Sequence, residues 1–274
     1  RSPVSTVNSE PMLDFHNHLM PGVDDGAANL DESRAGLAAF RNARISEVIT
    51  TPHIRASMMD RPEEFDPYMA ALDTAWGALT QLATEEFPEM ALDRGTEVML
   101  DIPSPNLSDP RVRLAGTSFV LIEFPFMNIP PHSVPAIRNI VESGWIPVIA
   151  HPERYRNMPG NHDLVEHWRE AGARMQVNTG SLVGQYGSTA RTISWELLRR
   201  GCVDYLSSDY HARGKCTVGD AVALLEKREA VQQLHALLTG NAERLLRNEM
   251  PLPVEPLEEE STSVWKRLLP WSSD

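Results

Sequence analysis

Histidine and carboxylate side chains recur where the strand-like segments of this 274-residue chain end. An apolar run over 12–15 leads into His16 and His18, and a second run over 48–51 leads to His53. Later strand-like segments carry or lead into side chains of the same kind: Glu97, Glu123, His151, Asp209 and His211. Mixed imidazole and carboxylate donors suit manganese, iron or zinc, so this pattern indicates a metal centre.

The pair His16 and His18 is the sharpest local signal. Residues two apart at the end of an extended strand point to the same side, so both imidazoles can reach one ion. Alone, the pair would fit two surface histidines equally well. The further donors at similar strand ends favour metal binding, and their number favours a cluster over a single ion.

These donors must be positioned by elements that alternate along the chain. Seven candidate strands are separated by segments with helical periodicity, and the one over 174–177 ends at Asn178. The alternation predicts parallel strands joined by right-handed crossovers. A closed or nearly closed (β/α)7 barrel would bring all of the donors to one mouth. The alternative is an open doubly wound sheet, whose single crevice is served by fewer strands.

Composition narrows the class of protein. A hydrophobic content of 42% supports one large core, and the formal charge of −13 argues against general nucleic-acid binding. The chain has no apolar run of about 18 residues, so no membrane span is expected, and no apolar signal core lies near its start. A cytoplasmic protein is therefore expected. Cys202 and Cys216 are too few for a disulfide framework and are expected to be reduced.

Several phosphate-transfer chemistries are excluded by the sequence. A cysteine-based phosphatase needs an arginine six positions after the cysteine, whereas Ser208 follows Cys202 and Val222 follows Cys216 at that spacing. The chain has no Asp-x-Asp strand end for an aspartyl-phosphate route. It also has no glycine-rich Gly-Lys-Ser or Gly-Lys-Thr loop for nucleotide hydrolysis.

Seven short motifs together resemble the polymerase and histidinol phosphatase (PHP) superfamily, and within it the bacterial metal-dependent tyrosine-protein phosphatases of capsule and exopolysaccharide loci. The motifs are Asp14-Phe-His-Asn-His18, Pro21-Gly-Val-Asp-Asp-Gly26, Thr51-Pro-His53, Gly95-Thr-Glu97, Leu121-Ile-Glu-Phe124, Ala150-His-Pro-Glu-Arg-Tyr155 and Ser208-Asp-Tyr-His211. The resemblance runs over 12–246 in the expected order. It implies a distorted (β/α)7 TIM-like barrel and hydrolysis of phosphotyrosine, an activity that spacing alone does not give.

The resemblance also implies a trinuclear cluster, with manganese expected and iron or zinc as alternatives. The first ion would take His16, His18, Glu97 and Asp209; the second would take Glu97 as a bridge, Glu123 and His151; the third would take Asp25, His53 and His211. Asp24 competes with Asp25, and its other role would be to cap the turn that Pro21, Gly22 and Gly26 make. Tyr210 between the last two ligands and Ala212 after them depart from the family pattern.

Phosphate ester hydrolysis at such a cluster needs no protein nucleophile, because a metal-bound hydroxide can attack phosphorus. Arg154 is the candidate phosphate clamp, since a guanidinium binds phosphate oxygens in a bidentate manner. Its alternative role is a surface ion pair with Glu153 or Asp163. Arg55 is a second candidate clamp, against a solvated loop arginine. His132 could contact substrate from the loop after Glu123, whereas His162, His167 and His235 are expected to be exposed.

The expected substrate is a phosphotyrosine protein, namely a bacterial tyrosine kinase that regulates polysaccharide synthesis. A small-molecule phosphoesterase such as histidinol phosphatase is the alternative, and a non-catalytic scaffold is disfavoured by the full ligand set.

The expected organisation is a polar arm over 1–11, a phosphatase domain over 12–250 and a tail over 251–274. The tail either packs on its own domain or docks onto a partner or a second subunit, so homo-oligomerisation is left open.

Overall fold

The computed structural model describes residues 11–258, in which nine strands form two parallel sheets. The three-stranded sheet has the order β1-β2-β4, with β1 (Met12–Asp14), β2 (Ile45–Thr50) and β4 (Ala91–Arg94). The six-stranded sheet has the order β3-β5-β6-β7-β8-β9. Its members are β3 (His53–Arg55), β5 (Glu97–Met99), β6 (Phe119–Glu123), β7 (Ile146–Ala150), β8 (Arg174–Asn178) and β9 (Tyr205–Ser207). The predicted parallel α/β class is confirmed.

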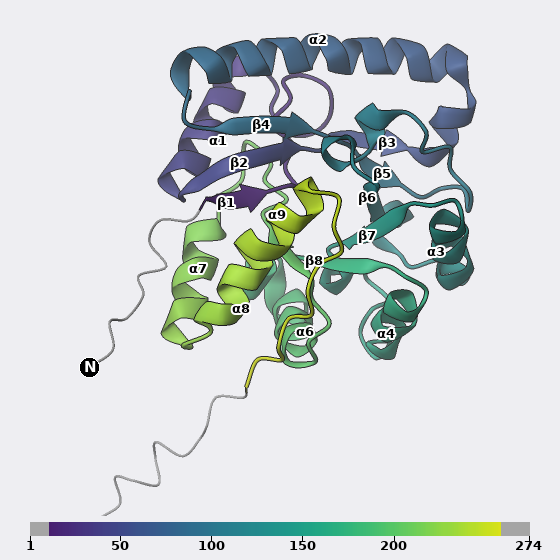
Figure 1. Cartoon of the computed structure of the whole chain (residues 1–274), viewed down its shortest axis with the longest axis vertical. Helices are drawn as coiled ribbons and strands as arrows, with labels where there is room; N and C mark the ends of the chain where they lie inside the picture. Colours follow the sequence, from purple (N-terminus) through teal and green to yellow (C-terminus); the bar gives the residue numbers. More distant parts are fainter. Residues whose placement is uncertain (1–10, 259–274) are drawn as a thin grey trace, which may run out of the picture.

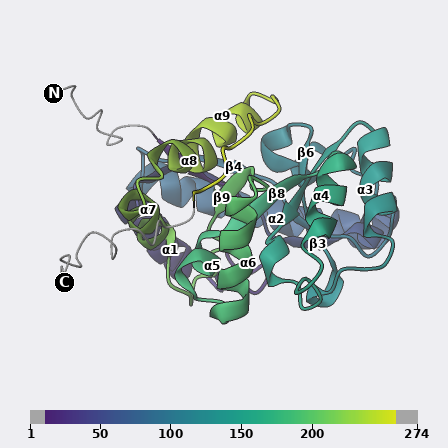
Figure 2. The same ribbon diagram turned by 90° about the horizontal axis from the view of Figure 1, so that it is seen from below.

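Helices surround the strands, with α2 lying along one side of the molecule (Figure 1). The first part of the chain contributes α1 (Leu30–Asn42), α2 (Pro62–Glu86) and α3 (Ser133–Glu142). The remaining helices are α4 (Asp163–Glu170), α5 (Thr179–Val183), α6 (Gly187–Arg199), α7 (Val218–Lys227), α8 (Val231–His235) and α9 (Asn241–Leu246). In a second view, α3 and α4 lie toward one end of the molecule and α7 and α8 toward the other (Figure 2). None of the helices within residues 11–258 combines the length and the apolar composition that crossing a membrane requires.

Local sequence explains where the first helices begin. The side chain of Asn29 accepts hydrogen bonds from the backbone N–H groups of Asp31 and Glu32, both at 3.0 Å, and so caps α1. The acidic side chains of these two residues also favour the positive end of the helix dipole. Pro62 occupies the first turn of α2, where its missing N–H and fixed φ cost nothing.

Two of the seven predicted strands are each divided into two short strands. β2 and β3 are separated by Thr51 and Pro52, and β4 and β5 by Gly95 and Thr96. Hydrogen bonds continue across both interruptions, from Gly95 N to Thr50 O at 2.9 Å and from Glu97 N to Pro52 O at 3.0 Å. Among residues 11–258, the strand ladders do not join into a ring, so the closed seven-stranded barrel stays a prediction.

The strands are buried on both faces, as expected for a parallel sheet covered by helices. Phe119, Val120, Leu121 and Ile122 of β6 are all fully buried. Aromatic rings extend this core between the end of β6 and α4, where the ring of Phe124 lies 5.3 Å from that of Trp168. The rigid core fixes the strand ends, and with them the side chains that follow each strand.

The segment after α9 packs against the domain. Asn241 and Leu252 exchange two hydrogen bonds, of 2.8 and 3.0 Å, and the side chains of Val254 and Leu257 are buried. The backbone N–H of Leu257 donates to Leu198 O of α6 at 3.1 Å. The predicted domain boundary at residue 250 stays a prediction. The predicted arm up to residue 10 and the tail beyond residue 258 lie outside the described residues.

Candidate metal centre

The predicted ligands meet beyond the carboxyl ends of the parallel strands. His16 and His18 follow β1, Glu123 ends β6, His151 follows β7, and Asp209 and His211 follow β9. His53 begins β3 just after the carboxyl end of β2, and Glu97 begins β5 just after the carboxyl end of β4. Asp25 comes from the loop after β1. Except for His151, these residues have donor atoms in three overlapping groups, and within each group the atoms lie within 4.8 Å of one another.

The first group contains His16, His18, Glu97 and Asp209, all of them buried. His16 Nε2 lies 3.1 Å from Glu97 Oε2 and 3.4 Å from Asp209 Oδ1. His18 Nε2 lies 3.4 and 3.5 Å from the same two oxygens. This group has the membership predicted for the first ion.

Several of these donor atoms have no hydrogen-bond partner among the described residues. They are His16 Nε2, His18 Nε2, His53 Nδ1 and Glu97 Oε2, and all four atoms are buried. Buried polar atoms are normally paired, because an unpaired one loses its hydration without compensation. Atoms of this chemistry that converge without partners fit a bound cation.

The second group joins His53, Glu97 and Glu123. His53 Nδ1 lies 3.1 Å from Glu97 Oε2 and 3.3 Å from Glu123 Oε1. His151, predicted for this ion, lies on the other side of the bridging carboxylate, with its Nε2 3.0 Å from Glu97 Oε1. The group that contains Glu123 therefore holds His53 in the place predicted for His151.

The third group contains the predicted Asp25, His53 and His211, together with His18. Asp25 Oδ1 lies 3.2 Å from His211 Nε2 and 3.4 Å from His53 Nε2. The Asp25 side chain is 70% exposed, so this group is the one most open to solvent. His53 faces the second group with Nδ1 and the third with Nε2.

Asp24 supports the centre from behind its ligands. Its Oδ2 lies 2.6 Å from His18 Nδ1, and its Oδ1 accepts a hydrogen bond from Gly26 N at 2.9 Å. The predicted turn cap is therefore present, but the contact with His18 was not predicted. A carboxylate on the far nitrogen of a ligand histidine fixes its tautomer and orientation.

A second supporting network comes from β8. Gln176 Oε1 lies 2.9 Å from His16 Nδ1, and Gln176 Nε2 donates to Asn178 Oδ1 at 2.9 Å. Asn178 Nδ2 then donates to Asp209 Oδ2 at 2.8 Å. The position of Asn178 at a predicted strand end was the available signal, but it does not reveal which ligand the amide would contact.

The electrostatics of the centre favour a bound cation. Burial opposes charge on His18, yet the carboxylates of Asp209, Asp24 and Glu97 outweigh it and hold the pKa of His18 well above its usual value. Burial also opposes the charge on Glu97, but the surrounding histidines hold its pKa well below the usual range. Burial opposes charge on His53 as well, but the nearby carboxylates of Glu123 and Glu97 outweigh it and raise the pKa of His53 to about 10. In the absence of an ion, the centre retains protons as its counter-charge.

Arg154 lies beside the first group. It forms an ion pair with Asp209 Oδ2, and its guanidinium lies over the ring of Tyr186 at 4.0 Å. Neither anticipated partner contacts it, because Glu153 accepts from Asn178 N and Ser181 Oγ, whereas Asp163 pairs with Arg200. Arg154 lines a pocket of about 290 Å³, together with Tyr186, Asp209, Tyr210, His211 and Lys215.

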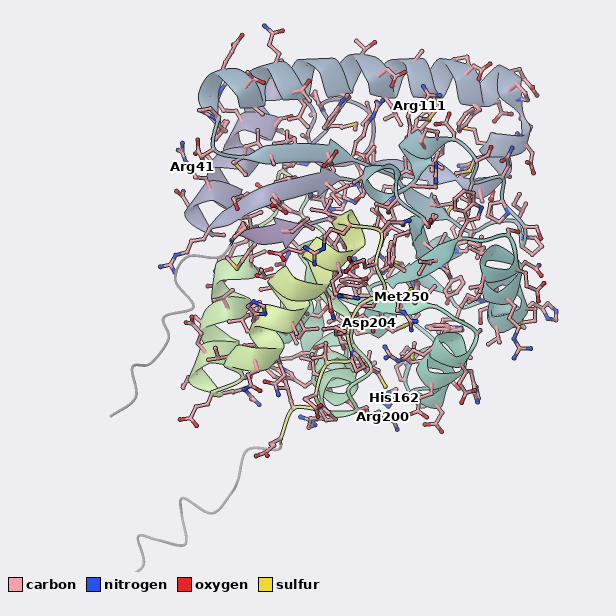
Figure 3. The ribbon with its side chains drawn as sticks, in the orientation of Figure 1. Arg41, Arg111, His162, Arg200, Asp204 and Met250 are labelled. Atoms are coloured by element: carbon pink, nitrogen blue, oxygen red, sulfur yellow. The ribbon has the colours of Figure 1, made fainter. Side chains whose placement is uncertain are left out.

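Arg55 and the remaining histidines lie outside these groups. Arg55 ends β3, is exposed and makes no ion pair with another described residue. His132, His167 and His235 are exposed. His162 is half-buried instead of exposed, because its Nδ1 lies 2.7 Å from Glu196 Oε1, in the same part of the molecule as Arg200 (Figure 3).

A larger pocket, of about 540 Å³, lies between the start of β1, α7 and α8. Its lining includes Met12, Ser46, Val222 and Leu234 and contains none of the predicted metal ligands. The convergent donors therefore identify the smaller pocket beside Asp209 as the place for chemistry.

Known proteins resemble this chain over most of its length. Residues 12–247 match the family model described as capsular polysaccharide synthesis, CpsB/CapC. The tyrosine-protein phosphatase YwqE of Bacillus subtilis is 32% identical over 243 residues, which cover 87% of this chain and 92% of YwqE. The tyrosine-protein phosphatase CpsB of Streptococcus pneumoniae is 23% identical over 255 residues, or 87% of this chain and 100% of CpsB.

A solved structure shares the fold. It comes from a study of YwqE from Bacillus subtilis and CpsB from Streptococcus pneumoniae, described as unique metal-dependent tyrosine phosphatases. The match has a TM-score of 0.75 at 30% identity and covers 90% of this chain and 100% of the solved one.

Proposed function

Because this chain belongs to the CpsB/CapC family of capsular polysaccharide synthesis, we propose that it is a metal-dependent protein-tyrosine phosphatase. The observation that carries the proposal is the meeting of nine predicted ligands at one place. Four of their buried donor atoms lack any other partner among the described residues. A site of this composition supports hydrolysis of a phosphate monoester.

The proposed cofactor is a trinuclear cluster, with manganese expected and iron or zinc as alternatives. His16, His18, Glu97 and Asp209 would hold one ion, Asp25, His53 and His211 another, and Glu97, Glu123 and His151 the remaining one. His53 Nδ1 is close enough to Glu97 and Glu123 to compete with His151 at that last position. When bound, the ions supply Lewis acidity toward the phosphate and an activated water as nucleophile.

The chain's own residues would bind and orient the phosphate. Arg154 uses Nη1 for Asp209, while its Nε and Nη2 donate no hydrogen bond to another described residue and remain available for phosphate oxygens. Tyr186 supports the guanidinium from the other side and forms an aromatic wall of the pocket. Arg55 would assist from the end of β3.

A cysteine nucleophile is disfavoured here. Burial raises the pKa of Cys216 to about 11, and burial also raises the pKa of the Cys202 thiol. Both side chains would therefore be protonated at neutral pH, whereas a nucleophilic cysteine must be a thiolate. This supports attack by water over a covalent intermediate.

The two sheets would form one distorted (β/α)7 ring around the centre. β2 with β3, and β4 with β5, would count as single interrupted strands, since hydrogen bonds bridge both interruptions. At the other edges, β1 and β9 approach through the bridge between Asn17 and Tyr210, where His18 N donates to Tyr210 O at 2.9 Å. Seven strand positions would then surround the metal ligands.

The proposed physiological substrate is a phosphorylated tyrosine kinase that regulates capsule or exopolysaccharide synthesis in the cytoplasm. The family's description in capsular polysaccharide synthesis supports this substrate. A small-molecule phosphoesterase, such as histidinol phosphatase, would use the same metals and the same pocket, so substrate preference is the property to measure.

The test is kcat/KM of manganese-loaded protein on a phosphotyrosine peptide and on histidinol phosphate, each with a chelated control. We expect a preference for the peptide that disappears on chelation and returns with added manganese. A preference for histidinol phosphate would move the protein to the small-molecule class. Hydrolysis that persists after complete metal removal would overturn the metal-dependent mechanism.

A further inference from the structure

A second pocket adjoins the reaction pocket. It has a volume of about 350 Å³, and its lining shares Arg154 and Tyr186 with the pocket that contains Asp209 and His211. The rest of its lining comes from Met127 and from the segments after β7 and around the start of α6: Glu153, Tyr155, Arg156, Pro159, Thr189 and Ala190. It contains none of the predicted metal ligands, so the proposed reaction gives it no role.

The second pocket is positively charged in a chain whose formal charge is −13. Arg156 is exposed, and its guanidinium makes no ion pair or hydrogen bond with another described residue. The acidic side chain in the lining, Glu153, is fully buried, and its Oε1 accepts hydrogen bonds from Asn178 N and Ser181 Oγ.

The wall of this pocket is held in place by backbone contacts. Arg156 N donates to Met127 O at 3.0 Å, and Asn157 exchanges hydrogen bonds of 2.9 and 3.0 Å with Ile129. Phe126 and Met127 both have φ of 55°, and the Phe126 side chain is 82% exposed. Left-handed backbone at two successive residues other than glycine is costly and tends to persist at binding sites. A pre-formed wall of this kind reduces the entropy lost when a ligand binds.

We propose that this pocket binds an anionic side chain of the same peptide whose phosphotyrosine enters the reaction pocket, with Arg156 as its partner. The inference rests on the proposed function and makes it more specific, because it assigns the enzyme to phosphotyrosine in an acidic context. An extended peptide advances by about 3.3 Å per residue. A residue within a few positions of the phosphotyrosine therefore reaches a pocket that shares a wall with the first.

The same chemistry has two sources in a peptide, a carboxylate and a second phosphorylated residue. Both would pair with the fork of donors that a guanidinium presents, and the phosphate would pair more strongly because it carries more charge. Arg156→Gln removes the charge but keeps a polar side chain, and Arg156→Lys keeps the charge but loses the fork. Arg138→Gln is the matched control, since Arg138 on α3 is also exposed and lines neither pocket.

The experiment compares kcat/KM on phosphotyrosine peptides that differ at one flanking position, which carries glutamate, phosphotyrosine or glutamine. The position is varied on both sides of the target residue. For the wild-type enzyme we expect a preference of about fivefold for the anionic residue at one or more positions. This preference should approach unity in Arg156→Gln, survive in part in Arg156→Lys and keep its wild-type value in Arg138→Gln.

A larger preference for flanking phosphotyrosine than for glutamate would assign the pocket to a phosphorylated residue, and equal preferences would assign it to any anionic side chain. Equal rates on anionic and neutral peptides, with hydrolysis intact, would overturn this inference and leave the proposed function standing. So would a preference that Arg156→Gln leaves unchanged. Absence of metal-dependent hydrolysis on every phosphotyrosine peptide would instead mean that the proposed function fails.

Discussion

Asp24 and Asp25 are neighbours in sequence, yet their carboxylates serve different atoms. Asp25 Oδ1 faces the Nε2 atoms of His53 and His211, whereas Asp24 Oδ2 contacts Nδ1 of His18. The Asp24 side chain is 5% exposed and that of Asp25 is 70% exposed. We therefore assign Asp25 to direct metal binding and Asp24 to the orientation of His18.

This division predicts different outcomes for two isosteric variants. Asp24→Asn should weaken metal affinity by about 10- to 100-fold, because the ring of His18 loses its anionic partner but keeps its ligand nitrogen. Excess metal should then restore turnover. Asp25→Asn should remain impaired at saturating metal. Calorimetric metal titration and activity against metal concentration measure both, and Asp31→Asn at an 89% exposed position is the control. Wild-type affinity in Asp24→Asn would contradict the orienting role.

Arg154 gives a second prediction. We expect Arg154→Ala to lower kcat/KM by about 10²- to 10³-fold, because a preorganised donor to the phosphate is lost. Arg154→Lys should recover part of the loss, since it keeps the charge but not the fork. Elemental analysis should show unchanged metal content. Normal kinetics would eliminate the clamp role, and loss of metal would show that Arg154 acts through Asp209.

Candidate ligands could be predicted from the sequence more readily than the residues that support them. His16 and His18 follow from residue type and strand end, whereas Asp25 was implied by the family resemblance. The partner of Arg154 was not predicted, because Asp209 lies 55 positions away and only the fold brings the two together. The same holds for Gln176, whose contact with His16 spans 160 positions.

At the scale of the elements, the turn after β1 must bring Gly26 against the backbone of His18. A Cβ added to Gly26 would lie 2.2 Å from His18 O and 2.3 Å from His18 Cβ, so a larger residue would displace the ligand strand. Gly26→Ala should therefore lower both the melting temperature and the metal content. Gly77→Ala on α2 is the matched control, because nothing lies within 4 Å of its added Cβ. That variant should be more stable by up to about 1 kcal/mol. Full metal content in Gly26→Ala would show that the turn can accommodate a Cβ without displacing His18.

The elements α4, β8 and β9 are joined by one buried carboxylate. Asp204, just before β9, accepts from Arg169 of α4 at 2.6 Å and from Met175 N of β8 at 2.8 Å. Asp204 lies in the middle of the molecule, between the helices and the strands (Figure 3). Arg169→Gln should reduce the free energy of unfolding by about 3 kcal/mol, since it leaves a buried charge without its partner.

The loss in Arg169→Gln should depend on pH in a defined direction. Burial raises the pKa of Asp204 above its usual 3.8, and Arg169 opposes that rise. Without Arg169 the folded-state pKa moves further up, so the folded protein holds a proton that the unfolded protein releases. Stability then falls as pH rises from the unfolded pKa through the folded one. Urea unfolding should show a smaller loss at about pH 5 than at about pH 8. An equal loss at both values would rule out the charge as the cause. Arg200→Gln, whose partners are more exposed, should cost less than about 1 kcal/mol.

The alternation of strands and helices could be predicted from the sequence, but the breaks within strands could not be placed. Pro52 has no backbone N–H to donate to a strand ladder. A Cβ added to Gly95 would lie 3.0 Å from Arg113 O, so the backbone approaches closely there. Each residue therefore interrupts its ladder for a local reason. Two of the seven predicted strand positions therefore hold two short strands each. Ring closure depends on the contact between the first and last strands, which hydrophobic periodicity does not report.

For the molecule as a whole, the net negative charge of the chain contrasts with the basic residues that line the two adjoining pockets. Arg154, Arg156 and Lys215 line the two adjoining pockets, although acidic residues outnumber basic ones by 38 to 25 over the chain. The ions proposed for the centre would add to this local positive field. A phosphorylated peptide would therefore be attracted at one place and repelled elsewhere, which favours productive orientation.

The segment over 251–257 bears on where the folded domain ends. Proline and glutamate content after residue 250 suggests a linker, yet the buried side chains of Val254 and Leu257 and the bond from Leu257 N to Leu198 O tie residues 251–257 to α6. Composition indicates how readily a segment is solvated, whereas the burial of two apolar side chains is enough to dock it on the domain.

Two truncated chains test this docking. One ends at Met250 and loses the segment; the other ends at Glu258 and keeps every contact described above. We expect the shorter chain to be less stable by about 3 to 6 kcal/mol, because burial of one valine and one leucine contributes about 1.5 to 3 kcal/mol each. Urea unfolding of both chains, loaded equally with manganese, gives the difference. Equal unfolding midpoints would show that the packing of Val254 and Leu257 contributes nothing. In that case the phosphatase domain would end at residue 250, because its stability would not depend on the segment that follows.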